Sequence, residues 1–125
     1  MPPTDVVFYC EEDGTAPIVE WLAKLTEKAR IKCLVYLARL EAEGHELRRP
    51  ISYYLRDGIY ELRPSHAGVQ YRILYFFQAR NAVVISHGLV KENTVPAAEI
   101  ERAIRSMKRY LSSPKKHTFI PGKGE

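Results

Sequence analysis

The sequence predicts a single α+β domain with a short N-terminal strand, a helical hairpin, an antiparallel three-strand meander and a C-terminal helix. Three observations support this class. Apolar residues recur at spacings of three and four in helical segments, and runs of β-branched and aromatic residues alternate with turn residues. The 125 residues, 46% of them hydrophobic and 27% charged, suffice for one core. We therefore expect residues 1–125 to form one domain, with the hairpin covering one face of a twisted sheet.

The N-terminal third predicts one strand and two helices. Residues 5–10 are rich in β-branched and aromatic side chains, which favours a strand. Pro17 suits the first turn of a helix whose apolar stripe continues to Leu25. Thr26 suits the N-cap of a second helix, and Gly44 is expected to end that helix in a left-handed conformation. These two helices form the predicted hairpin.

The rest of the chain predicts a basic loop, the meander and the last helix. Residues 45–58 are expected to form the basic loop. Three strand-like runs follow, and short connections favour antiparallel pairing between them: residues 59–63, 69–77 and 82–90. Pro96 is expected to open the last helix. We expect residues 113–125 to be a flexible basic tail.

The charge distribution predicts one positive face. The net charge is +4, and it divides into −4 for residues 1–47, +4 for residues 48–90 and +4 for residues 91–125. A positive face attracts polyanions such as RNA. A solvated surface with no function would give the same counts, so charge alone does not decide between the two interpretations.

Several classes of protein are not expected. No apolar run approaches the roughly 18 residues of a membrane span, and the N-terminus lacks the features of a secretory signal, so we expect a cytoplasmic protein without membrane contact. Cys10 and Cys33 are expected to be buried and unbridged. The sequence has no Gly-rich phosphate loop, CxxC or HExxH, and its histidines are scattered. We therefore expect neither a cofactor nor a metal site.

The meander is expected to bring basic side chains together on one face. Side chains in a strand alternate between the two faces of the sheet. Pairing Leu62 with Ile73 places Arg63 opposite Arg72, and continuing the meander across the next loop places His87 opposite Arg72 as well. Sliding a pairing by two residues would keep the same face. The three side chains are therefore expected to share one sheet face.

Two facing arginines repel each other and require an anion. Glu61 is one candidate, and an RNA phosphate, which matches the guanidinium fork, is another. In a purely structural alternative, Arg63 pairs with a helix carboxylate and Arg72 reaches solvent. If the anion is a phosphate, replacing Arg72 with Ala should abolish RNA cleavage and leave the fold intact.

Four segments, taken in order, resemble the RelE/HigB toxins, in particular their phage-derived branch: residues 59–63 (IYELR), 71–75 (YRILY), 87–91 (HGLVK) and 94–96 (TVP) leading into a helix. The resemblance covers roughly residues 5–112 and implies a RelE-like fold. It implies the toxin of a toxin–antitoxin system, a ribosome-dependent endoribonuclease that cuts messenger RNA without a metal. The implied partners are an antitoxin protein, the ribosome and messenger RNA.

The resemblance also implies catalytic roles. Arg63, Arg72 and Lys91 stand at the family's basic positions. His87 is a further catalytic candidate, because an ordinary histidine pKa of about 6.5 suits acid–base chemistry, although a satisfied sheet histidine is an equal alternative. The chain has Glu92 where a second basic residue is common, and it lacks a late tyrosine, so the general acid and base stay unassigned. The residues expected to bind RNA are Arg48, Arg49, Arg56 and His66.

Two other functions compete with the ribonuclease. A non-catalytic RNA-binding module would keep the basic face without cutting RNA, and a protein-binding regulator would use its surface for one partner chain. Cleavage on translating ribosomes separates the enzyme from the module. A steep loss of ribosome affinity with salt would argue against the regulator.

Overall fold

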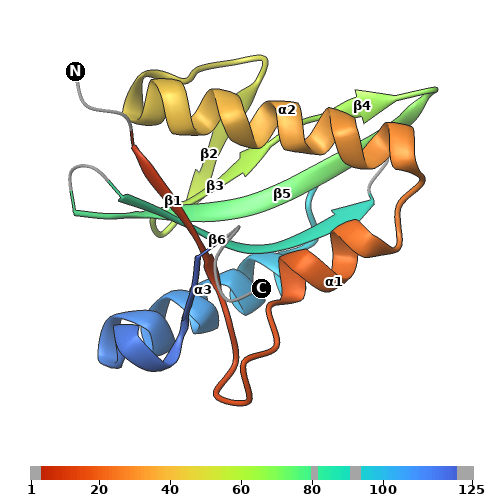
Figure 1. Cartoon of the computed structure of the whole chain (residues 1–125). Coiled ribbons are helices and arrows are strands. Elements are labelled where there is room, and N and C mark those ends of the chain that lie inside the picture. The colour runs from red at the N-terminus through yellow and green to blue at the C-terminus, as the bar shows by residue number, and fades with distance from the viewer. Residues whose placement is uncertain (1–3, 80–81, 91–93, 121–125) are drawn as a thin grey trace.

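The computed structural model describes residues 4–79, 82–90 and 94–120 (Figure 1). Their elements follow in chain order: β1 (Asp5–Tyr9), α1 (Pro17–Ala23), α2 (Glu27–Glu43), a 3₁₀ turn η1 (Gly44–Glu46), β2 (Ser52–Arg56), β3 (Ile59–Leu62), β4 (Ser65–His66), β5 (Val69–Gln78), β6 (Ala82–Val90), α3 (Ala97–Ser112), a second 3₁₀ turn η2 (Pro114–Lys116) and β7 (Thr118–Phe119). The predicted α+β class is confirmed.

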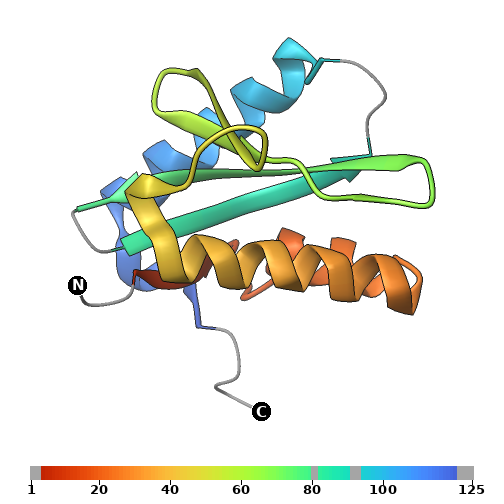
Figure 2. The ribbon, with the colours of Figure 1, turned by 90° about the horizontal axis from the view of Figure 1, so that it is seen from above.

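The strands form one mixed sheet between helices. The strand order is β2-β3-β5-β6-β1-β7, with β4 paired to β5, and β1 runs parallel to β6 whereas the other pairs are antiparallel. In Figure 2, α1 and α2 cover one face of the sheet and α3 covers the other. The predicted hairpin on one face is confirmed, and α3 completes a three-layer arrangement.

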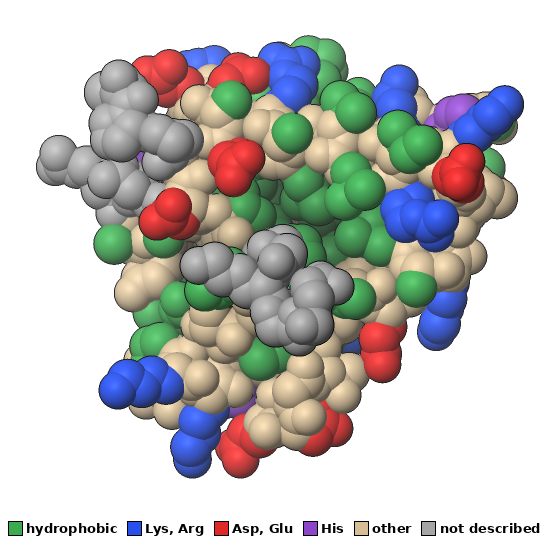
Figure 3. All heavy atoms as spheres, viewed as in Figure 1, with side chains coloured by type: hydrophobic (Ala, Val, Ile, Leu, Met, Phe, Trp, Pro, Cys, Tyr) green, Lys and Arg blue, Asp and Glu red, His purple; other side chains and the backbone are tan. Residues whose placement is uncertain are grey.

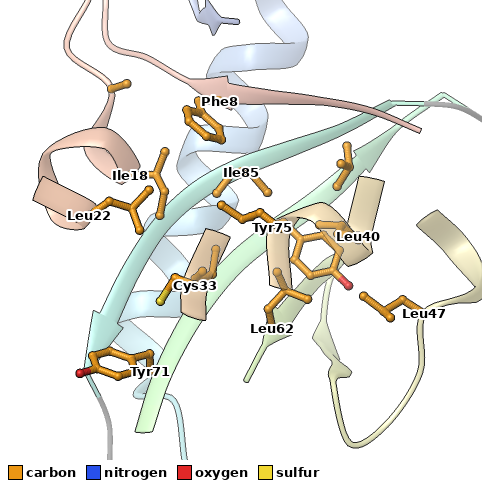
Figure 4. Close-up of a cluster of buried hydrophobic side chains, with 14 of the residues drawn as sticks. Phe8, Ile18, Leu22, Cys33, Leu40, Leu47, Leu62, Tyr71, Tyr75 and Ile85 are labelled. Atoms are coloured by element: carbon orange, nitrogen blue, oxygen red, sulfur yellow. The ribbon is translucent and has the colours of Figure 1, made fainter. Parts of the chain in front are cut away.

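A hydrophobic core lies on each side of the sheet. The side facing α1 and α2 includes Ile18, Leu40, Leu62 and Ile85, all fully buried (Figure 4). The α3 side has its own cluster, built from sheet residues such as Phe76 and helix residues such as Ala103. The two cores hold the sheet between fixed layers, so side chains at its ends have defined positions.

Helix α2 is apolar on more than its buried side. The Thr26 hydroxyl accepts a hydrogen bond from the Ala29 amide at 3.2 Å, and Gly44 ends the helix with φ of 53°, as predicted.

Cys33 of this helix is buried and free, as is Cys10. Three apolar residues of this helix are exposed: Ile31, Leu34 and Val35. Near them a hollow of about 580 Å³ lies between α2 and β1, and Figure 3 shows its apolar lining.

Two predicted loop regions contain regular structure. Residues 45–58 are not only a loop, because β2 pairs with β3 along Ser52–Arg56. The flexible tail predicted for residues 113–125 is wrong for residues 113–120. There, β7 pairs with β1, and the His117 Nδ1–H donates to the Cys10 carbonyl at 2.8 Å. The last five residues of the predicted tail lie outside the described residues.

The predicted register is right on one side of β5 and wrong on the other. Leu62 pairs with Ile73, as expected. However, His87 pairs with Leu74, whereas Arg72 pairs with Leu89. Two shifts of one residue each cause the difference. Near the β5–β6 connection, Phe77 pairs with Val83, where the expected register requires Ala82. A β-bulge adds the second shift, because Leu74 and Tyr75 pair with His87 and Ile85 and leave one extra β6 residue between them. The displacement at His87 amounts to two residues, so His87 keeps the predicted face.

No helix in the described ranges combines the length and the apolar character that crossing a membrane requires.

Candidate functional site

Glu61 organises a group of basic and aromatic side chains at one end of the sheet, on the face that α3 covers. Its carboxylate lies 3.3 Å from the Arg63 Nε through one oxygen and 3.0 Å from the Arg72 Nε through the other. Tyr53 of β2 stands directly opposite Glu61 in the strand register. We call Arg49, Tyr53, Glu61, Arg63 and Arg72 the arginine cluster. The parity argument therefore brought the two arginines together correctly, and Glu61 is their compensating anion.

Arg72 is the buried member of the arginine cluster. Its side chain is 5% exposed, and its terminal nitrogens donate to the Tyr71 carbonyl at 2.8 Å and the Gln70 side-chain oxygen at 2.7 Å. Its Nε and the Glu61 oxygen are close, although they are not aligned for a hydrogen bond. Burial lowers the pKa of Arg72, and the Glu61 charge opposes this shift. An alternative in which Arg72 reaches solvent is thus wrong.

Arg63 and Arg49 form the accessible part of the cluster. The Arg63 side chain is 31% exposed, and its guanidinium carbon lies 3.6 Å from the centre of the Tyr53 ring. Arg49 is exposed, and its guanidinium carbon lies 4.7 Å from the same ring centre. The helix carboxylate considered as a partner for Arg63 is replaced by Glu61 of the sheet. Sequence reasoning missed Tyr53 because residues 45–58 were predicted to be a loop, where no strand register applies.

The other predicted RNA-binding residues are not in the cluster. Arg56 forms ion pairs with Asp57 and Glu101, both at 2.7 Å, so neighbouring carboxylates balance its charge. Arg48 is exposed beside Arg49, and His66 is half-buried in β4. The predicted catalytic residue Lys91 lies outside the described residues.

His87 occupies a separate position on the same sheet face. The side chain is 2% exposed, with Nε2 at 2.8 Å from a Glu99 oxygen and Nδ1 at 2.8 Å from the Ser86 hydroxyl. Since a carboxylate only accepts, Nε2 carries the proton and Nδ1 accepts from Ser86 when the ring is neutral. Both ring nitrogens therefore form hydrogen bonds within the protein, which favours a structural role for His87 over a catalytic one. The catalytic role of His87 stays a prediction.

Burial makes the neutral form of His87 the stable one. It lowers the pKa of His87 from 6.5 to about 4, and the Arg102 charge acts in the same direction, whereas the Glu99 hydrogen bond opposes them. His87 and Arg102 line a cavity of about 300 Å³ together with Trp21 and Gly88. This cavity lies where β6 continues beyond the end of its pairing with β1. Trp21 packs against the core.

We expect His87 to make stability depend on pH below 6.5. Above that pH the ring is neutral in both states. As the pH falls, the unfolded chain takes up a proton that the folded chain resists, so the free energy of unfolding decreases. Between pH 6.5 and 5 the decrease should be about 1.5 kcal/mol. Urea unfolding of the wild type and His87→Gln across this range checks it. An equal pH dependence in the two proteins would contradict the assignment.

Metal ligands do not gather in the described part of the chain. No three His, Cys, Asp or Glu side chains there lie close enough to hold a metal ion. A metal-free reaction stays a prediction.

The architecture and the arginine cluster define an α+β protein compatible with the RelE-like fold. A family model described as phage-derived protein Gp49-like (DUF891) matches residues 20–108, most of the chain. The chain belongs to this family, which is RelE-like and toxin-like in general. No curated protein matches the chain significantly. The matched region includes the whole arginine cluster.

Proposed function

We propose that this chain is the HigB-like toxin of a type II toxin–antitoxin system, a ribosome-dependent, metal-independent endoribonuclease that cuts messenger RNA in the cytoplasm and inhibits translation. One observation carries the proposal. Arg49, in the turn before β2, and Arg63, directly after β3, form an accessible pair of guanidinium groups beside a buried carboxylate that orients one of them. Membership of a toxin-like family supports the same conclusion.

The proposed reaction needs positive charge in a fixed position. The RNA 2′-hydroxyl attacks the adjacent phosphorus, the bond from phosphorus to the 5′-oxygen breaks, and a 2′,3′-cyclic phosphate and a 5′-hydroxyl remain. One proton leaves the 2′-oxygen and one reaches the 5′-oxygen, so the charge on the phosphoryl oxygens rises only in between. Preorganised guanidinium groups stabilise that charge, and their fork matches phosphate geometry. Arg63 is in the cluster position that can make this contact.

The arginines of the cluster have different proposed roles. Arg72 is buried against Glu61, so we assign it the role of holding the carboxylate that in turn orients Arg63. Lys91, which follows β6, keeps its proposed role as a further positive charge. The residues that move the two protons remain to be assigned.

The proposed partner is an antitoxin that covers the arginine cluster. An acidic or helical surface of the antitoxin would place carboxylates against Arg49 and Arg63 and exclude RNA. Charge complementarity of this kind increases association rates and sets specificity.

Expression of the chain alone should arrest growth and translation. Co-expression of the protein encoded beside it should restore both, because the antitoxin occupies the RNA site. Growth curves, incorporation of labelled methionine and primer extension on cellular messages measure the effect. Unimpaired growth at confirmed soluble expression would count against the toxin.

A non-catalytic RNA- or protein-binding regulator is the second candidate. The hydrogen bonds of His87 favour it, since they engage both ring nitrogens of the histidine proposed for acid–base chemistry. Translating ribosomes incubated with the purified protein separate the two functions. The ribonuclease leaves cut messages, whereas the regulator leaves them intact.

A further inference from the structure

The ring of Tyr53 contacts two guanidinium groups at once. The Arg63 and Arg49 carbons lie 3.6 and 4.7 Å from the ring centre, so the two groups are no more than about 8 Å apart. Two positive charges at this spacing repel each other. The electron-rich face of an aromatic ring attracts each of them, which offsets part of the repulsion.

These contacts leave the binding groups of Arg63 accessible. Among the described residues, the contacts found for Arg63 use its Nε, toward Glu61, and its guanidinium face, toward Tyr53. The two terminal nitrogens of Arg63 are available to a ligand. In a bidentate arginine–phosphate contact, such nitrogens donate hydrogen bonds to the phosphate oxygens. Arg49 is exposed on the same ring. The ring therefore holds the two guanidinium groups without occupying the nitrogens that bind phosphate.

The position of Tyr53 in the sheet makes this arrangement rigid. Tyr53 pairs with Glu61 across β2 and β3, so its side chain stands on the same face as the carboxylate. Arg63 is thus fixed by the carboxylate through its Nε and by the ring through its flat face. A long side chain that is fixed at two places loses less conformational entropy on binding than a free one.

We propose that Tyr53 is a positioning residue for single-stranded RNA, whose ring holds Arg49 and Arg63 as a pair that binds the phosphate backbone. It acts through its ring and not through its hydroxyl. The proposal rests on the proposed function for its RNA substrate, but binding can be measured without cleavage.

The test measures the affinity of the purified chain for a fluorescent single-stranded RNA at several salt concentrations. Tyr53→Phe keeps the ring, so its affinity stays within about twofold of the wild type. Tyr53→Leu weakens binding roughly tenfold. Its plot of log affinity against log salt also becomes shallower, by about 0.7 for each phosphate that the protein no longer neutralises. Tyr54→Leu is the matched control, since Tyr54 is the exposed neighbour and its ring packs on Tyr60.

Thermal unfolding is measured for every variant to show that it folds. If Tyr53→Leu does not fold, Arg49→Gln and its combination with Tyr53→Phe replace it. Arg49 is exposed, so Arg49→Gln is expected to fold and to lose about tenfold in affinity, whether or not Tyr53 keeps its hydroxyl.

Three outcomes overturn the proposal: Tyr53→Phe binding as weakly as Tyr53→Leu, Tyr53→Leu binding like the wild type, or wild-type binding that does not depend on salt. The failure of the proposed function looks different. In that case the wild type binds RNA with the expected salt dependence and Tyr53→Leu weakens it, yet messages on translating ribosomes stay intact. That result supports the proposal that the Tyr53 ring positions the two arginines, and it refutes only the proposed ribonuclease activity.

Discussion

Replacing Arg72 with Ala should lower the free energy of unfolding by about 3 kcal/mol or more, because it removes one partner of a buried ion pair. The Glu61 side chain is 3% exposed and would keep only the more distant Arg63. The sequence alone suggested the opposite, namely that two repelling arginines would tolerate the loss of one. The structure corrects this expectation, since the buried carboxylate changes the sign of the effect.

Urea unfolding measures this prediction, with two comparisons. Arg56→Ala removes only exposed ion pairs, which solvent screens, so it should destabilise the protein much less than Arg72→Ala. The double variant Glu61→Leu with Arg72→Met removes both buried charges, so it should be more stable than Arg72→Ala. If Arg72→Ala unfolds within about 1 kcal/mol of the wild type, the pair does not organise the cluster.

Replacing Arg63 with Ala should reduce RNA cleavage by about 10²- to 10³-fold and leave the fold intact. The loss is that expected for one preorganised charge-stabilising group at a transition state. The fold should persist because Arg63 is partly exposed and Glu61 keeps Arg72 as its buried partner. Primer extension on a translated message measures the rate, and the same assay with a chelator tests whether a metal is needed.

A matched control for this variant lies on the opposite side of the sheet. Arg39 of α2 is also an exposed arginine in an ion pair, with Glu43 at 2.9 Å, and Arg39→Ala should cut at the wild-type rate. Cleavage by Arg63→Ala at that same rate would refute the proposed contact with phosphate. Equal losses in both variants would point to a general effect of net charge.

The sequence by itself determined which side chains share a sheet face. The two-residue period of a strand places Arg63 and Arg72 together whichever even register is used. The pairing of Leu62 with Ile73 was also predictable, because a short connection limits the ways in which the strands can meet. The helix boundaries at Pro17 and Gly44 have equally local causes.

Only the tertiary structure decided how that face is used. Tyr53 enters the site because β2 pairs with β3, and the last strand forms because β1 offers an edge to Thr118–Phe119. A one-residue shift at the β5–β6 connection and the bulge in β6 together place His87 opposite Leu74 instead of Arg72. Glu61 becomes a buried anion only when the layers close over it. Each of these depends on contacts between residues far apart in the chain, which local periodicity does not encode, whereas the choice of sheet face depends only on neighbouring residues.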